Sequence, residues 1–357
     1  MRIAQLTYSY QPIIGGADAY AELLCQTFRQ RGHEVWVYQR AAHMEDPFVQ
    51  VAPRWQARFR PRDFWLVPHW LRTQRRELRA FEVLVAHYPN YCRAAYFHPR
   101  LIGLSHGVTW DDSPHTWRSR IKRRIAQEAF ARCSRFVAND TFFLREMGLD
   151  IAPATRAFEE VAKGRWYIPN CVDTSVFTPD ADERPPSILV PRNLYRNRGV
   201  HLAVEGFAQV AGRLPDYEML IVGADSEADY AASVRALVAR IGLSGRVHFV
   251  GSVPWNEMPR VYRRCRVCLI PSLCGEGTSL AALEAMACGV ATVTTTAGGL
   301  LDLPAVHCPP TAQDLAQALE RAVSRWREIA DEQRETVRSQ FSLDYWREAW
   351  INVVENW

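Results

Sequence analysis

The chain has 357 residues, of which 48% are hydrophobic and 23% are charged, which predicts a soluble globular protein long enough for two domains. The formal net charge of +4 is unevenly distributed, because residues 1–180 carry 25 Lys+Arg against 18 Asp+Glu while residues 181–357 carry 18 against 21. We therefore expect the two halves of the chain to meet different partners.

The sequence carries no pattern typical of export or membrane insertion. Its first residues, MRIAQLTYSYQPIIGG, lack a basic region followed by an apolar block, and no window offers about 18 apolar residues without a charge. The nine cysteines are scattered and odd in number, which favours reduced thiols. Cys265 and Cys268 form a CxxC without a second pair or a nearby histidine, so we expect core thiols and a cytoplasmic protein without a metal or cofactor.

The first half of the chain alternates strand and helix patterns. An apolar run at 2–8 leads through Gly15 and Gly16 into a helical pattern. These two glycines predict a tight turn where a backbone can approach a ligand, although they do not form a GxGxxG motif. The further strand candidates are EVWVYQ, FEVLVAHY, LIGLSHG, RFVAND and RWYIPN. We expect a doubly wound α/β domain over residues 1–175.

The pattern restarts after the polar, proline-bearing segment at 178–187, which reads TPDADERPPS. The strand candidates that follow are SILVPR, EMLIVG, RVHFVG, RVCLIPS and VATVTTT, with helical patterns between them. A second α/β domain is therefore expected over residues 185–340. The tail at about 343–357 has helical periodicity with an aromatic face, and either closes one domain or crosses back to the first.

Charged residues in the second half indicate a site. Residues 275–289 read GEGTSLAALEAMACG, an apolar helix pattern that contains Glu284 and is preceded by Glu276. Burying an ionised carboxylate is costly unless it is partnered, so these glutamates are expected to have partners. Arg192 follows a strand and Arg198 precedes a helix, which predicts two guanidiniums near one helix N-terminus, an anion site. The alternative is a pair of solvated loop arginines.

Taken in order, these segments resemble a known family. The chain resembles the retaining, nucleotide-sugar-dependent glycosyltransferases of the GT-B fold, glycosyltransferase family four or "glycosyl transferases group 1". The carrying motifs run along the whole chain: GGADAYAELLCQTFRQRGHEVWVY, LSHG at 104–107, YIPNCVDTSVFTP at 167–179, PRNLYRNRG, EMLIVGAD and RVHFVGSV. The most specific is the E-x7-E arrangement of Glu276 and Glu284, followed by AMACG and a GG pair.

The resemblance implies a role for each candidate residue at an interdomain cleft. Glu276 would contact hydroxyls of the donor sugar, and Glu284 would accept hydrogen bonds from the nucleotide ribose. Arg192 and Arg198 would hold the diphosphate without a metal, although the family usually has lysine at the second position. The further expected contacts are backbone amides at Gly277, Thr278, Ser279 and Leu280, the loop at Gly15 and Gly16, the base-binding backbone from Gly251 to Val253, and His106 beside the reacting sugar.

The implied function is transfer of a sugar from a nucleotide-sugar donor to an acceptor hydroxyl with retention of configuration, in bacterial polysaccharide, glycolipid or glycoconjugate biosynthesis. One alternative is a nucleotide-sugar-binding protein without turnover, which would use the same residues. A second is an NAD-dependent oxidoreductase. That class wants a glycine fingerprint after a first strand with an acidic residue about 20 positions on, and neither half offers one.

The acceptor is an unknown hydroxyl compound, and a lipid-linked one is among the candidates. Residues 115–132 put Trp117, Ile121 and Ile125 on one helical stripe beside several basic residues, a surface suited to anionic lipid. The alternative is a solvated helix packed on its own domain. The basic segment at 53–72 favours a protein located peripherally at the inner face of the membrane. Nucleic acid is not expected, because no recognition motif accompanies the basic residues.

Overall fold

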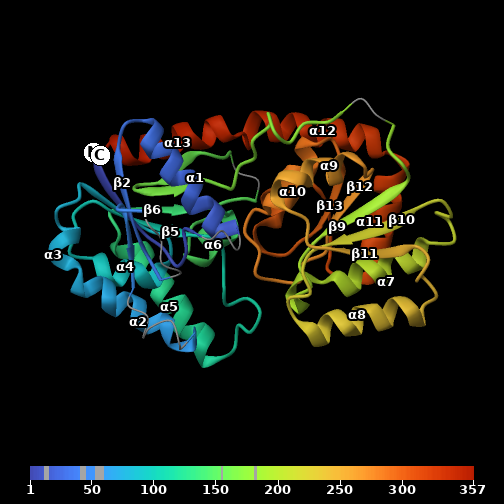
Figure 1. Ribbon diagram of the computed structural model, residues 1–357, viewed down its shortest axis with the longest axis horizontal. Helices are drawn as coiled ribbons and strands as arrows, with labels where there is room; N and C mark the ends of the chain where they lie inside the picture. The colour runs from blue at the N-terminus through green and yellow to red at the C-terminus, as the bar shows by residue number, and fades with distance from the viewer. Residues whose placement is uncertain (12–15, 41–45, 53–59, 154–155, 181–182) are drawn as a thin grey trace. The chain divides into compact units, whose positions relative to one another are not determined.

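The computed structural model describes residues 1–11, 16–40, 46–52, 60–153, 156–180 and 183–357. The chain forms two compact units, each built on one largely parallel sheet flanked by helices (Figure 1). Unit 1 comprises Met1–Ile151, Arg156–Asn170 and Asp344–Trp357, whereas Cys171–Leu343 belongs to unit 2. The C-terminal segment therefore returns to the unit in which the chain begins.

The sheet of unit 1 has the strand order β3-β2-β1-β4-β5-β6-β8-β7 over its described residues. Neighbouring strands pair in parallel, except that β7 and β8 form an antiparallel hairpin at the edge. The strands are β1 (Arg2–Leu6), β2 (Glu34–Gln39), β3 (Val49–Val51), β4 (Val83–Ala86), β5 (Leu101–Ser105), β6 (Arg135–Ala138), β7 (Glu159–Ala162) and β8 (Arg165–Tyr167).

Helices cover both faces of this sheet. Ala4 and Leu6 of β1 join one apolar cluster, while Gln5 between them donates a hydrogen bond to Cys25 of α1 on the other face. The C-terminal helix α13 packs on α1, where Trp350 Nε1 donates to the Tyr20 hydroxyl at 2.7 Å. The helices are α1 (Gly16–Gln30), α2 (Arg60–Thr73), α3 (Arg75–Leu78), α4 (Pro89–Ala95), α5 (Trp117–Arg132), α6 (Thr141–Glu146) and α13 (Leu343–Glu355).

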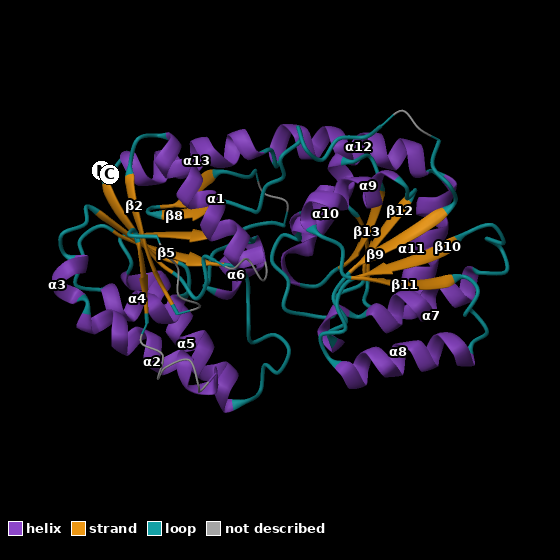
Figure 2. Cartoon of the chain, in the orientation of Figure 1, coloured by secondary structure: helices purple, strands orange, loops and turns teal. Residues whose placement is uncertain are grey.

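The sheet of unit 2 is parallel throughout its described strands, in the order β11-β10-β9-β12-β13-β14 (Figure 2). The strands are β9 (Ser187–Pro191), β10 (Glu218–Val222), β11 (Val247–Gly251), β12 (Val267–Ile270), β13 (Ala291–Thr295) and β14 (Val306–Cys308). The helices are α7 (Val200–Val210), α8 (Ala228–Arg240), α9 (Met258–Arg263), α10 (Leu280–Ala287), α11 (Ala312–Ser324) and α12 (Trp326–Gln340), with the 3₁₀ helices η2 (Arg196–Arg198), η3 (Trp255–Glu257) and η4 (Gly298–Asp302).

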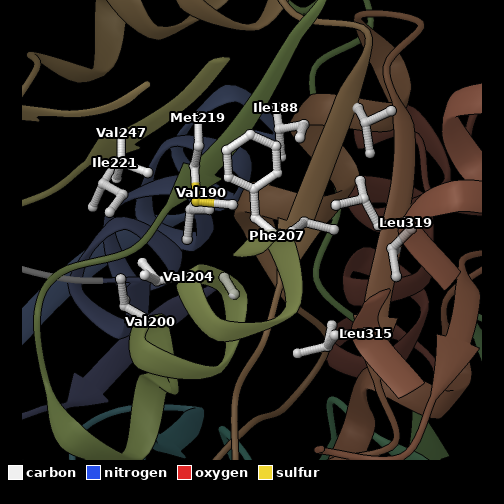
Figure 3. Packing of buried hydrophobic residues seen from close by; sticks show 14 of the residues in the cluster. Ile188, Val190, Val200, Val204, Phe207, Met219, Ile221, Val247, Leu315 and Leu319 are labelled. Carbon is white, nitrogen blue, oxygen red and sulfur yellow. The ribbon is translucent and has the colours of Figure 1, made fainter. Parts of the chain in front are cut away.

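Alternating strand residues build the two apolar layers of unit 2. Ile188 and Val190 of β9 pack with Phe207 of α7 in one cluster, as Figure 3 shows, and Leu189 between them joins a second cluster with residues of α10. A strand buried on both faces has to be apolar at every position, which explains the continuous run SILVP. Cys265 and Cys268 are both fully buried in the second cluster, so their expected place as core thiols is confirmed.

The expected fold is confirmed. Each strand pattern expected from the sequence corresponds to a strand of the sheet, and EVWVYQ matches β2 residue for residue. The sequence reading missed β3, β7 and β14, which are edge strands or lie beside an edge and have only three or four residues. Such segments are too short to show periodicity. No helix in the described part of the chain is long and apolar enough to cross a membrane.

Candidate functional site

The strand order of unit 2 fixes where its site lies. The chain runs outward from β9 to β11 and then returns to place β12 on the other side of β9. The connections that leave the carboxyl ends of β9 and β12 diverge, and in open α/β sheets such a reversal point is where ligands bind. Arg192 directly follows β9, and Glu276 lies in the segment between β12 and α10. Two residues far apart in sequence therefore meet at one edge.

Both predicted arginines converge on Glu276. One carboxylate oxygen, Glu276 Oε1, lies 3.3 Å from Nη2 of Arg192 and also forms an ion pair with Nη1 of Arg198. The same oxygen accepts a 2.7 Å hydrogen bond from the Ser272 hydroxyl. Glu276 is only 5% exposed, so these three donors compensate its burial. The alternative of two solvated loop arginines does not describe this pair.

The cluster keeps an excess of positive charge. Burial lowers the pKa of Arg192 to about 10, and burial followed by repulsion from Arg192 lowers that of Arg198 to about 10. Both guanidiniums remain charged at neutral pH, and a single carboxylate cannot neutralise them. The buried Nε of Arg192 has no hydrogen-bond partner among the described residues. A buried donor without a partner costs free energy, so this edge of the sheet is suited to an anion.

Two glycines allow the loops of the cluster to approach closely. Gly199, which precedes α7, has φ of +64°, and a Cβ there would lie 2.0 Å from the carbonyl oxygen of Pro271. Gly298, in the GG pair of the motif, has φ of +54°, and its Cβ would lie 2.3 Å from the carbonyl oxygen of Glu276. Side chains at these positions would force the loops after β9 and β12 apart.

The N-terminus of α10 opens beside the arginines. Ser279 caps this helix by accepting a hydrogen bond from the Ala282 amide, and its hydroxyl also accepts one from Arg192 Nη2 at 3.0 Å. Thr278 is buried, whereas Gly277 and Leu280 are partly exposed. The segment expected to present backbone amides therefore lies at a helix start, where the helix dipole adds positive potential.

Glu284 lies inside the apolar helix and has protein partners of its own. Its Oε1 accepts a hydrogen bond from Trp255 Nε1 at 2.9 Å, and its Oε2 accepts one from the Tyr262 hydroxyl at 2.8 Å. Burial raises the pKa of Glu284 to about 7, although these two hydrogen bonds oppose the shift. The expectation that polyol hydroxyls alone would partner the two glutamates was too simple, because protein donors already hold both.

The remaining predicted positions of unit 2 lie at the end of β11. Gly251 is the last residue of that strand, has φ of +82°, and accepts a hydrogen bond from the Gly223 amide. Val253 follows and is partly buried. Their expected role beside a base stays a prediction.

In unit 1, His106 belongs to a neutral group of side chains. It follows β5, and its Nε2 lies 3.3 Å from Nδ1 of His87, the residue that follows β4. Nε2 of His87 lies 2.6 Å from the side-chain oxygen of Gln5. Burial lowers the pKa of His106 to about 4, and burial followed by repulsion from His106 lowers that of His87 well below its ordinary value. Both imidazoles are neutral at pH 7.

His106 also lines a cavity of about 350 Å³ within unit 1. Its walls include aromatic rings from Tyr8, Tyr88 and Trp110, and the side of the cavity formed by α5 includes Lys122. The Lys122 ammonium donates one hydrogen bond to the Thr109 carbonyl, which leaves further N–H donors on it. The cavity thus combines apolar faces with neutral and basic polar groups.

Two predictions for unit 1 need qualification. Gly16 is the first residue of α1, whereas Gly15 lies outside the described residues. The proposed lipid-facing stripe on α5 is wrong in part, because Ile125 is buried in the unit and Trp117, 66% exposed, is the solvent-facing apolar residue of the three. Most of the basic segment at 53–72 cannot be assessed, because 53–59 lie outside the described residues; Trp70 and Leu71 are buried in the core.

Sequence reasoning missed the residues that hold the site residues in place, namely His87, Trp255, Tyr262 and Ser272. Tyr262 could have been suspected, because a tyrosine in an apolar helix pattern needs a partner for its hydroxyl once buried. Trp255 is exposed and lies in a short 3₁₀ helix, so neither periodicity nor burial points to it. The described residues contain no cluster of three or more His, Cys, Asp or Glu arranged to hold a metal ion.

Comparisons with known proteins agree with this geometry. Residues 14–154 match the model of the Glycosyltransferase Family 4 domain, and residues 185–325 match that of Glycosyl transferases group 1. A phosphatidylinositol N-acetylglucosaminyltransferase from Arabidopsis thaliana is 26% identical over 352 residues, covering 91% of this chain and 74% of that protein.

Solved structures show the same fold. Sucrose-phosphate synthase from Thermosynechococcus elongatus aligns with a TM-score of 0.81 at 19% identity, covering 97% of this chain and 96% of that one. HepE of Anabaena, solved in complex with UDP-glucose, aligns over 100% of both chains with a TM-score of 0.76 at 17% identity. The two family matches together span most of the chain, and it belongs to the family-four, group 1 glycosyltransferases with the GT-B fold.

Proposed function

We propose that this glycosyltransferase uses a nucleoside-diphosphate-sugar donor and transfers the sugar to an acceptor hydroxyl with retention of configuration, without a metal ion. The observation that carries the donor assignment is the convergence of Arg192 and Arg198 on Glu276 beside the N-terminus of α10. Two guanidiniums, a helix start and a buried unpartnered N–H form an environment suited to a diphosphate. Retention rests on the family resemblance.

The chemistry asked of this cluster is stabilisation of a leaving group. As the bond between the anomeric carbon and the diphosphate oxygen breaks, negative charge grows on the departing nucleoside diphosphate, and the two guanidiniums and the α10 amides are already aimed at it. The acceptor oxygen forms its bond on the same face, and its proton passes to a phosphate oxygen of the leaving group. In this account the arginines supply the positive charge that a divalent cation provides in metal-dependent enzymes.

The two glutamates have different roles in this proposal. Glu276 lies among the arginines, before the helix begins, and is assigned to the donor sugar. Glu284 lies further along α10 and is assigned to the ribose, which does not react. The role of His106 beside the reacting sugar is carried over from the resemblance, and its lowered pKa makes it a neutral hydrogen-bonding group rather than a charged one.

For the acceptor we propose a lipid-linked hydroxyl compound whose head group enters the cavity of unit 1. The Arabidopsis relative is by its name a phosphatidylinositol N-acetylglucosaminyltransferase, and the cavity of this chain offers aromatic faces for an apolar ring face and Lys122 for an anionic group. The helix that carries Lys122, α5, also exposes Trp117, Arg118, Arg120 and Arg124. Such a surface would keep the enzyme at the inner face of an anionic membrane.

The experiment that tests the function combines ligand screening and turnover. UDP-, GDP- and ADP-sugars are tested for an increase in Tm in the presence of a chelator, and the donors that bind are then incubated with lipid-linked acceptors. We expect stabilisation by one nucleotide class, a glycosylated lipid with the donor's anomeric configuration by NMR, and no loss of activity to the chelator. Stabilisation without product would favour a binding protein, and stabilisation by NAD(H) alone would overturn the donor assignment.

A further inference from the structure

Glu284 is held by donors from two other elements of unit 2. Trp255 lies in η3, Tyr262 in α9 and Glu284 in α10, and the two donors contact different oxygens of one carboxylate at 2.9 and 2.8 Å. Glu284 is 7% exposed, so its carboxylate is nearly covered while a small part stays accessible. Neither donor was assigned a role by the family resemblance.

The number of donors leaves room for a ligand. An ionised carboxylate offers about four lone-pair positions, and the tryptophan and tyrosine occupy two of them, one on each oxygen. The two remaining positions match the two neighbouring hydroxyls of a ribose. The protein donors are thus compatible with ribose binding and fix the direction in which the free lone pairs point.

Trp255 is an unusual donor because its ring is 60% exposed although its N–H is used. It is kept in place by Phe177, whose ring meets the indole edge-on with centroids 5.4 Å apart and meets Tyr262 at 6.1 Å. Phe177 is itself buried, so the indole is anchored on one side while the other is open to solvent. This anchoring gives an exposed side chain the fixed orientation that a positioning role requires.

We propose that Trp255 is a positioning residue of the donor site: its indole N–H, together with the Tyr262 hydroxyl, keeps the Glu284 carboxylate ionised and oriented to accept hydrogen bonds from the nucleotide ribose. The proposal rests on the proposed function, in which Glu284 contacts the ribose. It adds a residue outside the E-x7-E motif to the donor site and makes donor affinity depend on pH through that residue.

The protonation of Glu284 gives the sign of the effect. Burial raises its pKa to about 7 and the two donors oppose that rise, so removing a donor raises the pKa further. The other titratable groups that act on Glu284 are the thiols of Cys268 in β12 and Cys288 after α10, and burial raises the pKa of both, which keeps them neutral. Ribose binding should therefore weaken as pH falls through the pKa of Glu284, and at a higher pH in a variant without the indole N–H.

The test is calorimetric titration of the full chain with UDP and, separately, GDP between about pH 6 and pH 9. Trp255→Phe keeps an aromatic ring against Phe177 and removes the N–H. It should lower affinity about 10-fold at pH 7, the size expected for one hydrogen bond to a charged group, and approach wild type at pH 9. Glu284→Gln serves as the reference, because the pH dependence that remains in it belongs to the diphosphate, whose own pKa lies near about 6.

A double-mutant cycle shows whether Trp255 acts through Glu284. Trp255→Phe in the Glu284→Gln background should change affinity less than twofold, about the uncertainty of an additive pair. Trp357→Phe removes another partly exposed indole that donates to a backbone carbonyl, in unit 1, and should leave UDP and GDP binding unchanged. This control accounts for general effects of exchanging tryptophan for phenylalanine.

The outcomes separate the inference from the function beneath it. An equal loss at every pH, no loss at all, or a full effect of Trp255→Phe in the Glu284→Gln background would overturn the positioning role. If the wild-type chain binds neither UDP nor GDP at any pH, the nucleotide assignment of the site fails first. Tyr262→Phe should show the same upward shift of the pH dependence, measured on protein whose circular dichroism matches wild type.

Discussion

The two units use the same central strand order and place different chemistry at the same edge of their sheets. In unit 2, the residues after β9 and β12 bring two guanidiniums onto one carboxylate. In unit 1, the residues after β4 and β5 bring together His87 and His106, both held neutral by burial. One edge carries an excess of positive charge, and the other offers uncharged imidazoles beside an aromatic cavity.

The difference teaches that the topology sets the location of a site and the side chains set its ligand. The reversal in strand order gathers loop residues in both units, but only unit 2 places groups there that can stabilise a growing negative charge. We infer that the diphosphate belongs to unit 2 and that the uncharged ring of a substrate is the natural ligand of unit 1. The predictions below test that division of roles, beginning with the largest expected effect on turnover.

The largest effect is expected from the arginines of unit 2. Arg192→Ala and Arg198→Ala should each lower kcat/KM by roughly 10-fold to 1000-fold, because each loses a contact to charge that grows in the transition state. Arg196→Ala is the matched control, since Arg196 lies in the same 3₁₀ helix as Arg198 but its guanidinium stacks over Tyr230. Steady-state kinetics should show a change below about twofold for the control. Equal losses in all three variants would point to a general effect of charge.

The two glutamates should differ in the kind of loss. Glu276→Gln keeps the shape and removes the charge nearest the reacting sugar, so it should act mainly on kcat and on sugar choice. Glu284→Gln should raise the donor KM roughly 10-fold with kcat nearly kept, because the ribose is bound equally in ground and transition states. Kinetics with the full donor separate the two. The reverse pattern would mean that the two carboxylates are assigned the wrong way round.

The neutral histidines of unit 1 should make stability depend on pH. The unfolded imidazole titrates near about 6.5, whereas burial lowers the pKa of His106 to about 4, so the unfolded state binds protons first as pH falls. The stabilisation is fully present above about pH 6.5 and is lost toward pH 4. We expect the Tm of His87→Gln to fall less than that of wild type between about pH 7 and pH 5, by a few degrees. Parallel curves would show that His87 does not contribute.

The smallest effect on turnover is expected from the basic surface of α5. Replacing the exposed residues Arg118, Arg120 and Arg124 with Gln should weaken sedimentation with phosphatidylglycerol vesicles at low salt and leave turnover of a detergent-dispersed acceptor unchanged. Arg75, Arg76 and Arg79 of α3 are also exposed, and their replacement removes the same charge elsewhere on unit 1. Equal weakening by both triple variants would indicate net charge rather than a docking face.

The fold could be predicted from the sequence largely because its strands are buried on both faces. Apolar runs such as SILVP and VLVA have few other uses in a chain of this composition, and the loops that follow them are then determined. The short edge strand β3 has one buried residue and left no pattern. The placement of Arg192 after a strand and of Arg198 before a helix was likewise readable.

The contacts within the site could not be read from the sequence. Glu276 meets Arg192 only because β9 and β12 are neighbours in the sheet, a pairing that involves residues far apart in the chain. The fixed loop approach at Gly298 depends on a backbone angle, and the hydrogen bond from Trp255 depends on an anchor at Phe177. Ile125 was assigned to a surface because helical periodicity gives a face without saying whether a domain covers it.

The most direct test of the division of roles is calorimetry with UDP and GDP in the presence of a chelator. The account predicts that one of the two nucleotides binds the wild-type chain, that the double variant Arg192→Ala/Arg198→Ala loses at least about 100-fold in affinity, and that His106→Ala binds as wild type. Unchanged binding in the double variant, binding that requires Mg²⁺, or an equal loss in His106→Ala would contradict the assignment of the diphosphate to the arginine cluster of unit 2.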